Sequence, residues 1–442
     1  MGRPGNRLKQ FAAILLLGGL AACASAPSET RAPAPFAALS ASATGNGFSE
    51  NGLAALDAAM ASAVDDGHVK GISTLLVRDG EVIHYFTHGI RRAEDQAPVT
   101  EDTIFRIYSM SKPLTGVALM TLYEDGAFSL DDPVTKFVPE FAGLKVLEGM
   151  DANGQPILAE TDHVPTMREL MSHTAGFGYG LGGDDPVNKA FRDQAVLGSP
   201  DLDTYISKVA GIPLLFQPGS DWSYSTAVDI QGYIIQKISG KPFGQYLQDE
   251  IFAPLGMTDT AFYVPDSKRD RFSDVFTRDA ETGDQTPLDG PRFAYREGGV
   301  GMEAGGHGLV STLGDYARFC QMMVSGGELD GERILRPETV DLMRTNVLPE
   351  SFHLFSDGTS VNPDRAGHGF GLDFGVLVDP SATGTKMPAG TYYWGGAAGT
   401  WFWIDPVNDL FFIGMVQLFP AGSMDNSFRK EAGDLVYEAL QK

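Results

Sequence analysis

The sequence predicts a fold of the α/β class, α+β in type. An antiparallel sheet flanked by helices is expected to be built from both ends of the chain, with a mostly helical lobe inserted between them. Three observations support this. A helical pattern followed by a β-hairpin pattern begins near residue 53. Segments with helical periodicity dominate residues 113–330. Aromatic and β-branched runs return near residue 368, before a final helix.

The first ordered elements are expected soon after residue 47. Residues 53–67 repeat apolar side chains at helical spacing, which predicts an amphipathic helix. Residues 71–89 contain two strand-like runs on either side of Asp79-Gly80, a dipeptide that favours a tight hairpin turn. A helix followed by a hairpin indicates a sheet with a helix on one face.

The middle of the chain is expected to be mostly helical. Four segments combine helical periodicity with a glycine that would stop the helix: residues 116–126, 167–176, 227–240 and 313–327. Long segments rich in Gly, Pro and Asp lie between them, notably residues 176–200 and 264–300. Loops of that length usually have a function, so we expect these two to form walls of a cleft.

The end of the chain is expected to complete the sheet. Strand-like runs occupy residues 368–379, 390–405 and 410–419, and a helix is expected over residues 426–441. Pro-Val-Asn-Asp at residues 406–409 separates the last two runs as a hairpin turn would. The predicted catalytic domain, residues 48–442, therefore consists of a sheet lobe, about 48–110 and 305–442, and a helical lobe, about 111–304.

Residues 1–22 predict a secretory signal peptide. Basic residues near the start precede an apolar run, "FAAILLLGGLAA", that is shorter than the roughly 20 residues needed to cross a bilayer. The tetrapeptide Leu20-Ala21-Ala22-Cys23 resembles a bacterial lipobox, and the resemblance implies that cleavage leaves Cys23 as a lipidated first residue. A secreted protein in which Cys23 has no role is the alternative.

Residues 23–47 are rich in Ala, Ser, Pro, Thr and Gly, which predicts a flexible tether between the lipid and the domain. We therefore expect the protein in the bacterial cell envelope. Ala24 follows Cys23 where lipoproteins retained at the inner membrane often have Asp, so by analogy we expect the periplasmic face of the outer membrane. Cys320 is the other cysteine of the chain, which leaves the mature domain without a pair for an internal disulfide.

The charge of the chain argues against some partners. The formal net charge is −24 at pH 7, and so acidic a surface repels nucleic acids and anionic lipid headgroups. We expect no nucleic-acid partner, and membrane contact through the N-terminal lipid only. The histidines show no metal-ligand spacing such as His-Glu-x-x-His, so we expect no metal and no cofactor. The sequence does not indicate an oligomeric state.

A Ser-x-x-Lys pair, Ser109 and Lys112, is the first candidate for catalysis. Pro113 is tolerated only in the first turn of a helix, so the helix must begin close to Ser109. Both side chains then lie on one face of that turn, where unpaired N–H groups and the helix dipole favour a developing oxyanion. A second match, at Ser427 and Lys430, falls in the expected terminal helix, and we interpret it as structural.

The Ser109 hydroxyl needs a base, because a serine is barely ionised at neutral pH. Lysine and tyrosine are poor bases in isolation, but desolvation disfavours an ammonium and a nearby ammonium favours a phenolate. Tyr224 follows a Pro-Gly turn and precedes a helical run, where its side chain can point into a cleft. Composition alone favours a packing role for this tyrosine.

Three motifs occur in the order and broad spacing of a known superfamily: Ser109-x-x-Lys112, Tyr224-Ser225-Thr226 and Trp394-Gly395-Gly396. Over about residues 53–440, the chain resembles the serine β-lactamases and penicillin-binding proteins. It is most similar to the class C related carboxylesterases called family VIII. Further similar segments are residues 170–177, 216–225 and 305–319. The resemblance implies a β-lactamase/transpeptidase-like fold.

The resemblance also implies roles for the motif residues. Ser109 would be the acylated nucleophile and Lys112 its proton partner. Tyr224 would act as general base for the attack and for deacylation. The backbone N–H groups of Ser109 and Ala397 would form the oxyanion hole.

The third motif departs from the lactamase pattern. Lactamase and peptidase relatives usually have Lys-Thr-Gly or His-Thr-Gly there, whose cation helps to hold a substrate carboxylate, whereas Trp394 has no charge. Trp394, Gly395 and Gly396 are therefore expected to bind a neutral ester, and the glycines let the strand edge approach it closely. Thr226 stands where many relatives have Asn, and its role stays open.

The leading hypothesis is a serine carboxylesterase that forms an acyl-enzyme on Ser109 with a small-molecule ester. Two alternatives keep the acyl-enzyme: acyl transfer to an amine or alcohol, and hydrolysis of β-lactams or D-alanyl peptides. A non-catalytic envelope protein with a relic fold is the fourth hypothesis. Of the histidines, we expect His173 to orient the loop after its helix and His307 to line the cleft.

Overall fold

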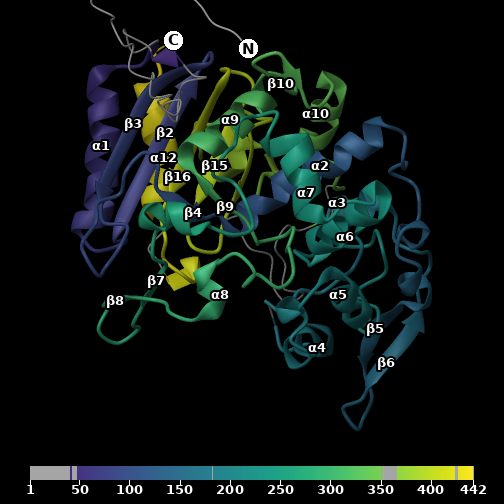
Figure 1. Ribbon diagram of the computed structural model, residues 1–442. Coiled ribbons are helices and arrows are strands. Elements are labelled where there is room, and N and C mark those ends of the chain that lie inside the picture. Colours follow the sequence, from purple (N-terminus) through teal and green to yellow (C-terminus); the bar gives the residue numbers. More distant parts are fainter. Residues whose placement is uncertain are drawn as a thin grey trace, which may run out of the picture. The chain divides into compact units, whose positions relative to one another are not determined.

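The computed structural model describes residues 40–41, 47–181, 183–349, 352, 366–423 and 427–441 of the chain. The predicted signal peptide and Cys23 lie outside the described residues. One eight-stranded sheet forms the centre of the described domain, and helices cover both of its faces (Figure 1).

The sheet joins strands from the two ends of the chain. Its order is β1-β3-β2-β16-β15-β14-β13-β12, and each neighbouring pair is antiparallel except β1 with β3. These strands are β1 (Ser40–Ala41), β2 (Gly71–Arg78), β3 (Glu81–Gly89), β12 (His368–Phe370), β13 (Gly375–Leu377), β14 (Tyr392–Gly395), β15 (Trp401–Asp405) and β16 (Leu410–Met415). The N-terminal hairpin therefore lies directly beside the last strand, which confirms the predicted antiparallel sheet built from both chain ends.

The turn between β2 and β3 shows why the hairpin forms where it does. Asp79 and Gly80 both have positive φ, 51° and 73°. A two-residue turn of this kind matches the twist of the flanking strands, and Asp and Gly tolerate the left-handed backbone that it needs.

The rest of the described chain consists of helices and short strand pairs. The helices are α1 (Glu50–Asp65), α2 (Ser111–Glu124), α3 (Met167–Met171), α4 (Pro186–Asp193), α5 (Leu202–Val209), α6 (Ala227–Ser239), α7 (Phe243–Leu247), α8 (Pro291–Ala294), α9 (Leu313–Val324), α10 (Pro337–Arg344), α11 (Pro380–Thr383) and α12 (Ser427–Ala439). The short pairs are β4 (Ile104–Arg106) with β9 (Val310–Thr312), β5 (Lys145–Met150) with β6 (Pro156–Glu160), β7 (Phe276–Arg278) with β8 (Gln285–Pro287), and β10 (Glu328–Leu329) with β11 (Glu332–Arg333).

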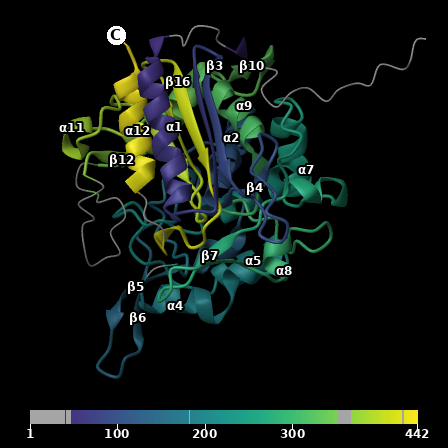
Figure 2. The same ribbon diagram turned by 90° about the vertical axis from the view of Figure 1, so that its left-hand side faces the viewer.

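Different helices cover the two faces of the sheet. Figure 2 shows α1 and α12 side by side over one face, with α2 and α9 behind the sheet. Along β2, Leu76 packs into the core under α1 and α12, whereas Leu75 and Val77 pack into the other core. This alternation follows from the two-residue period of a strand. Because both faces are covered, the strand reads as a continuous apolar run.

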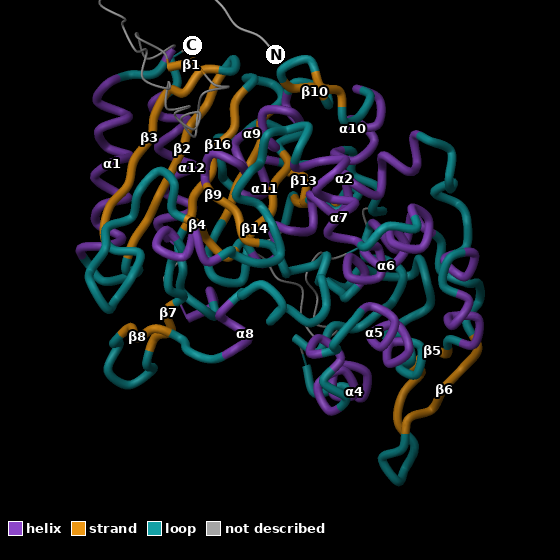
Figure 3. The backbone as a smooth tube through the Cα atoms, in the orientation of Figure 1, coloured by secondary structure: helices purple, strands orange, loops and turns teal. Residues whose placement is uncertain are grey.

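The lobe between α2 and α9 consists mainly of helices and loops, with β5 and β6 as a projecting hairpin (Figure 3). Helix α2 is buried on nearly all sides, and it packs against α6 of this lobe as well as forming part of the sheet-side core. A helix that is apolar all round belongs in a core. Helix α2 therefore carries its first turn into the middle of the domain.

Two boundaries differ from the sequence prediction. Helix α3 ends at Met171 and does not continue towards residue 176, because His173 has a φ of 59°, which is left-handed and incompatible with an α-helix. Ser40 and Ala41, which fall inside the predicted tether, pair with Glu81 and Val82 of β3. Within the described residues, no helix combines the length and apolar character needed to cross a membrane.

Candidate active site

Ser109 lies at a sharp strand-to-helix turn. Strand β4 ends at Arg106, and the Ile107 N–H then donates to the Leu309 carbonyl at 3.1 Å. Tyr108 has a φ of 44°, so the chain reverses direction there and enters a 3-10 turn over Tyr108–Met110. Helix α2 follows at Ser111, as the position of Pro113 predicted. The turn places Ser109 at the helix N-terminus with its side chain partly exposed.

The structure brings Ser109, Lys112 and Tyr224 together. The Tyr224 hydroxyl donates a hydrogen bond of 2.7 Å to Ser109 Oγ, and Lys112 Nζ donates to the same oxygen at 3.4 Å. Tyr224 lies in the loop before α6, far from Ser109 in the sequence. Tyr224 is partly exposed, whereas Lys112 is buried with 1% of its surface accessible.

Lys112 is surrounded by neutral groups. Its Nζ donates to the Gly306 carbonyl at 2.7 Å and to the Tyr179 hydroxyl at 3.2 Å. Nζ also lies 4.5 Å from the centre of the Tyr224 ring and 5.1 Å from that of Tyr179. Carbonyl dipoles and aromatic faces both attract a cation, and they stabilise this buried ammonium.

The motif analysis did not identify Tyr179 and Gly306. Both lie in glycine-rich loops, "GFGYG" at residues 176–180 and "GGHG" at residues 305–308. The glycines indicate that another backbone segment approaches closely there, but they do not indicate contact with a catalytic lysine. Burial raises the pKa of Tyr179 well above its usual range, so its hydroxyl stays protonated.

Asp229 holds the Gly306 loop from behind. The Gly306 N–H donates to Asp229 Oδ1 at 2.8 Å, while its carbonyl accepts from Lys112. The Thr226 hydroxyl donates to Asp229 Oδ2 at 3.3 Å and also hydrogen bonds with the Tyr205 hydroxyl. Thr226 is fully buried at the start of α6, where its hydroxyl bonds to these two side chains.

His307 lies beside the same carboxylate. Its Nδ1 is 3.8 Å from Asp229 Oδ1, and 29% of its side chain is accessible. Burial lowers the pKa of His307, the charge of Asp229 acts in the opposite direction, and the charge of Lys112 lowers it further. His307 belongs to the loop that binds Lys112 through the Gly306 carbonyl.

His173 fixes the loop that carries Tyr224. Its carbonyl accepts the Ser223 N–H at 3.1 Å, and its Nδ1 accepts the Ser225 N–H at 3.2 Å. These two bonds are on either side of Tyr224, whose ring centre is 5.3 Å from that of His173. Because Nδ1 accepts this hydrogen bond, the neutral ring carries its hydrogen on Nε2.

Aromatic side chains enclose the Tyr224 ring. Tyr179 meets it edge-on at 5.3 Å between centres, Trp222 is stacked at 6.5 Å, and Trp394 lies at 5.4 Å. Trp394 also packs edge-on against Phe370 and is only 7% exposed. Most of its indole therefore packs against Tyr224 and Phe370, and little of it is accessible to a bound molecule.

The end of β14 lies against the backbone that precedes Ser109. A Cβ on Gly396 would meet the Ile107 carbonyl oxygen at 2.4 Å, so only glycine allows this approach. The Thr400 hydroxyl donates to the same carbonyl at 3.3 Å, and the Gly396 N–H donates to the Thr400 carbonyl at 2.7 Å. Ala397 follows, partly exposed, and packs with the buried Tyr108 ring. The oxyanion hole at Ala397 stays a prediction.

The other serines of the two Ser-x-x-Lys matches, Ser111 and Ser427, lie in surroundings that differ from those of Ser109. Ser111 is buried, and its Oγ accepts the Leu309 N–H at 3.1 Å. Ser427 is exposed at the start of α12, and Lys430 forms an ion pair of 2.8 Å with Asp434 on that helix. Helix α12 covers the face of the sheet opposite α2, which separates the second match from the site.

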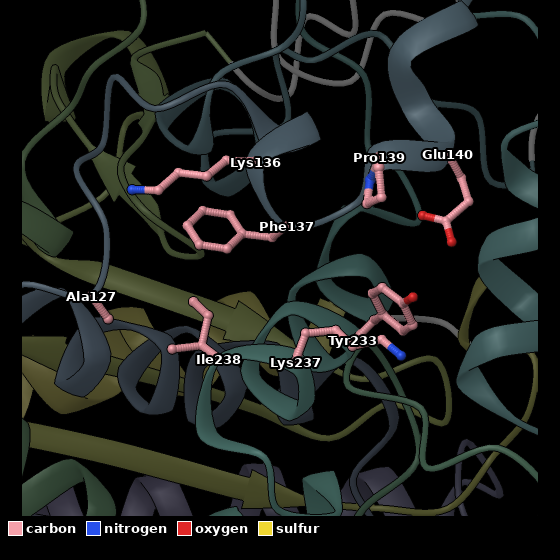
Figure 4. Close-up of a pocket in the computed structure, with 8 residues that line it drawn as sticks. All are labelled: Ala127, Lys136, Phe137, Pro139, Glu140, Tyr233, Lys237 and Ile238. Carbon is pink, nitrogen blue, oxygen red and sulfur yellow. The ribbon is translucent and has the colours of Figure 1, made fainter.

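A groove on the helical lobe contains none of these side chains. It has a volume of about 510 Å³ and is shown in Figure 4 with its lining residues: Ala127, Lys136, Phe137, Pro139, Glu140, Tyr233, Lys237 and Ile238. Its two lysines pair with Asp132 and Asp203 at 2.7 and 2.8 Å. The described residues contain no cluster of three or more His, Cys, Asp or Glu suited to a metal ion.

Comparison with known proteins identifies the family. The family model described as Beta-lactamase matches residues 56–434. This chain belongs to the serine β-lactamase and penicillin-binding protein family. Its fold is therefore the β-lactamase/transpeptidase-like fold that the motifs predicted.

Relatives of this β-lactamase family member include esterases. Protein Rv1367c of Mycobacterium tuberculosis is 34% identical over 82% of this chain and 89% of its own length. Esterase EstB of Burkholderia gladioli is 30% identical over 79% of this chain and 86% of its own length. The solved structure of EstCE1, described as a hydrolase with promiscuous acyltransferase activity, is 26% identical, with a TM-score of 0.72, and the match covers 88% of this chain and 99% of that one. These relatives support a hydrolase and are consistent with the family VIII esterases.

Replacing His173 by Gln should weaken the dependence of stability on acid pH. Burial, and then the charge of Lys112, hold the pKa of His173 well below its usual 6.5. Below about pH 6.5 the unfolded chain binds a proton here that the folded chain does not. The free energy of unfolding therefore falls by about 1.4 kcal/mol for each further pH unit, until the folded-state pKa is reached.

Urea denaturation at about pH 7.5 and about pH 5.5 measures this contribution. In His173→Gln the loss of stability between the two pH values should be smaller than in the natural protein by about 1.4 kcal/mol. An equal loss in both proteins would show that the buried imidazole is not held neutral.

Proposed function

We propose that the protein is a serine carboxylesterase that works through an acyl-enzyme on Ser109. The observation that supports this most directly is that Tyr224 and Lys112 both lie within hydrogen-bond distance of Ser109 Oγ. The Tyr224 hydroxyl lies 2.7 Å from Ser109 Oγ, and Lys112 Nζ lies 3.4 Å from it. A serine hydroxyl becomes a nucleophile when a base within hydrogen-bond distance takes its proton.

Acylation begins when Ser109 Oγ attacks the carbonyl carbon of the ester. The Oγ–C bond forms, the Ser109 proton passes to the Tyr224 oxygen, and the carbonyl π electrons move to the carbonyl oxygen. To accept this proton, Tyr224 must act as a phenolate, whose charge the ammonium of Lys112 over its ring would stabilise. The two groups share their protons as a coupled pair. Collapse of the intermediate breaks the bond to the alcohol, which leaves with the proton from Tyr224.

Deacylation repeats these steps with water in place of Ser109. Tyr224 takes a proton from the water as its oxygen attacks the acyl carbon. The C–Oγ bond then breaks, the carboxylic acid leaves, and the proton returns to Ser109 Oγ. The same tyrosine therefore serves both half-reactions, as microscopic reversibility favours.

The oxyanion of each half-reaction is assigned to the backbone N–H groups of Ser109 and Ala397. The close approach of Gly396 to the Ile107 carbonyl supports this assignment, because it holds the end of β14 against the Ser109 turn. A pair of such donors in a closed site contributes about 3 kcal/mol or more to the stability of the transition state.

The substrate class follows from the third motif. Trp394 stands where lactamases have a cation, so a carboxylate of the substrate would find no charged partner at that position. The aromatic side chains around Tyr224 favour an uncharged substrate instead. The likeness to Esterase EstB of Burkholderia gladioli supports an ester substrate.

Replacement of the three site residues should abolish ester hydrolysis without unfolding the protein. With p-nitrophenyl butyrate, Ser109→Ala should lose turnover by about a thousandfold or more, and Lys112→Met and Tyr224→Phe by about 10²–10⁴-fold, because each removes a part of the proton-transfer path. Ser427→Ala, from the second Ser-x-x-Lys match, is the matched control and should keep full activity.

The site of acylation can be located in the same proteins. A fluorophosphonate probe followed by mass spectrometry should label the peptide that contains Ser109 in the natural protein and in the control. Undiminished turnover by Ser109→Ala would overturn the proposed chemistry. Fast turnover of nitrocefin by the natural protein would instead overturn the substrate class argued from Trp394.

Acyl transfer is the second candidate, supported by the likeness to EstCE1. An alcohol that enters the site would attack the acyl-enzyme in place of water and yield a new ester. Adding benzyl alcohol to the p-nitrophenyl ester assay and measuring acid and ester by chromatography separates the two. A hydrolase gives acid at every alcohol concentration, whereas a transferase gives the benzyl ester in proportion to the alcohol.

We also propose that the mature protein is lipid-anchored at Cys23, on the periplasmic face of the outer membrane. The proposal rests on the apolar run before Cys23 and on the lipobox-like residues next to it. In a bacterial host given labelled palmitate, the natural protein should take up label and sediment with outer membranes, and Cys23→Ser should do neither. Equal labelling of Cys23→Ser would refute the anchor.

A further inference from the structure

Asp373 is a buried carboxyl group on the turn between β12 and β13. It is 1% exposed, and its φ is 63°. Its N–H donates to the Met171 carbonyl at the end of α3 at 3.0 Å, and the Leu372 N–H donates to the Met343 carbonyl of α10 at 2.9 Å. The turn is thereby held beneath the helical lobe, and the Asp373 side chain points into it.

The carboxyl group meets one amide. Gln231, fully buried on α6, donates from Nε2 to Asp373 Oδ1 at 3.0 Å. The other oxygen of each group, Asp373 Oδ2 and Gln231 Oε1, is also buried and has no hydrogen-bond partner in the described residues. The Asp373 carboxyl group and the Gln231 amide are thus joined by one hydrogen bond, and each has one further acceptor oxygen that receives no donor.

A single proton satisfies both oxygens. A carboxylate only accepts hydrogen bonds, as does an amide oxygen, so an ionised Asp373 would leave both atoms unsatisfied in a buried region. A protonated carboxyl group can donate from Oδ2 to Gln231 Oε1 while Oδ1 still accepts from Nε2. The two planar groups then exchange two hydrogen bonds in a closed ring.

We propose that Asp373 is a neutral carboxylic acid paired with the Gln231 amide by two hydrogen bonds, and that this pair positions helix α2 against helix α6 at the catalytic site. The part that concerns catalysis rests on the function proposed above. Burial independently raises the pKa of Asp373 well above its usual range, the hydrogen bond from Gln231 and the charge of Lys112 acting in the opposite direction.

The location of the pair explains its link to the site. A Cβ on Gly116 would meet Asp373 Oδ2 at 2.5 Å, so the carboxyl group lies directly against the bare backbone of α2, one turn beyond Lys112. Gln231 lies on α6, which begins three residues after Tyr224. The pair thus bridges the helix of the nucleophile and the helix that follows the base.

Neutrality of the pair also matters for Lys112. Among the described residues, Lys112 on α2 is the charged group that acts on Asp373, while α6 contributes the uncharged Gln231 and α3 a backbone carbonyl. A buried negative charge here would favour the ammonium form of Lys112. A neutral acid adds no charge beside Lys112.

Infrared spectroscopy of the full chain in D₂O at neutral pH tests the protonation state. A protonated carboxyl group absorbs at higher frequency than a carboxylate. The difference spectrum between the natural protein and Asp373→Asn should therefore contain one carboxylic-acid carbonyl band. A difference spectrum with carboxylate bands only would overturn the proposal. This readout needs no substrate, so it stands or fails independently of the proposed esterase activity.

Two variants test the positioning role. Asp373→Asn keeps an acceptor and a donor in the same places and tolerates the left-handed backbone, so it should retain the melting temperature and kcat within twofold. Gln231→Leu removes both the donor and the acceptor of the side-chain amide at an unstrained helix position, and it should lower kcat at least tenfold with little change in KM. A large loss of activity or folding in Asp373→Asn would show that a charged carboxylate is required, and would contradict the neutral pair.

Discussion

The site depends on one buried cation. Lys112 is almost fully enclosed, and the described residues place no carboxylate in ion-pair contact with its ammonium group. An ammonium has three N–H donors, each of which needs an acceptor once water is excluded. Here three neutral oxygens accept them, from Gly306, Tyr179 and Ser109. Neutral oxygens therefore satisfy all three N–H donors of this buried ammonium.

The acceptors come from separate parts of the chain, and this sets the architecture. Ser109 lies at the end of β4, Tyr179 in the loop after α3, and Gly306 in the loop before β9. Antiparallel pairing of β4 with β9 brings the first and last of these together. The fully buried helix α2 then gives Lys112 a fixed position between the sheet and the helical lobe. The fold therefore places the acceptors around the cation before any substrate binds.

Two buried carboxyl groups near α2 differ in the number of hydrogen-bond donors around them. Asp229 accepts the Gly306 N–H and the Thr226 hydroxyl, so donors surround it. Asp373 meets one amide and the bare backbone of Gly116. The second arrangement, with one donor, suits the protonated acid proposed for Asp373. The residue type is the same, and the number of donors around it makes the difference.

The sequence by itself determined the class of fold and the three motif positions. Helical and strand periodicities, Asp79-Gly80 and Pro113 are local signals, because they act through neighbouring backbone and side-chain geometry, and the structure follows them. The Ser-x-x-Lys pattern indicated Ser109 and Lys112 for the same reason. Tyr224 was assigned a catalytic role from its motif, whereas amino-acid composition alone favoured a packing role for it.

Only the tertiary structure decided which groups surround those positions. Tyr179 and Gly306 reach Lys112 from loops that are distant in sequence, and Asp229 on α6 binds the Gly306 loop. No local pattern specifies which loop group meets a helix turn. The same holds for Asp373 and Gln231, whose pairing depends on Gly116 leaving room for a carboxyl group. Local periodicity determines where a helix or strand forms, but contacts between distant segments depend on how those elements pack, and packing is a property of the whole folded chain.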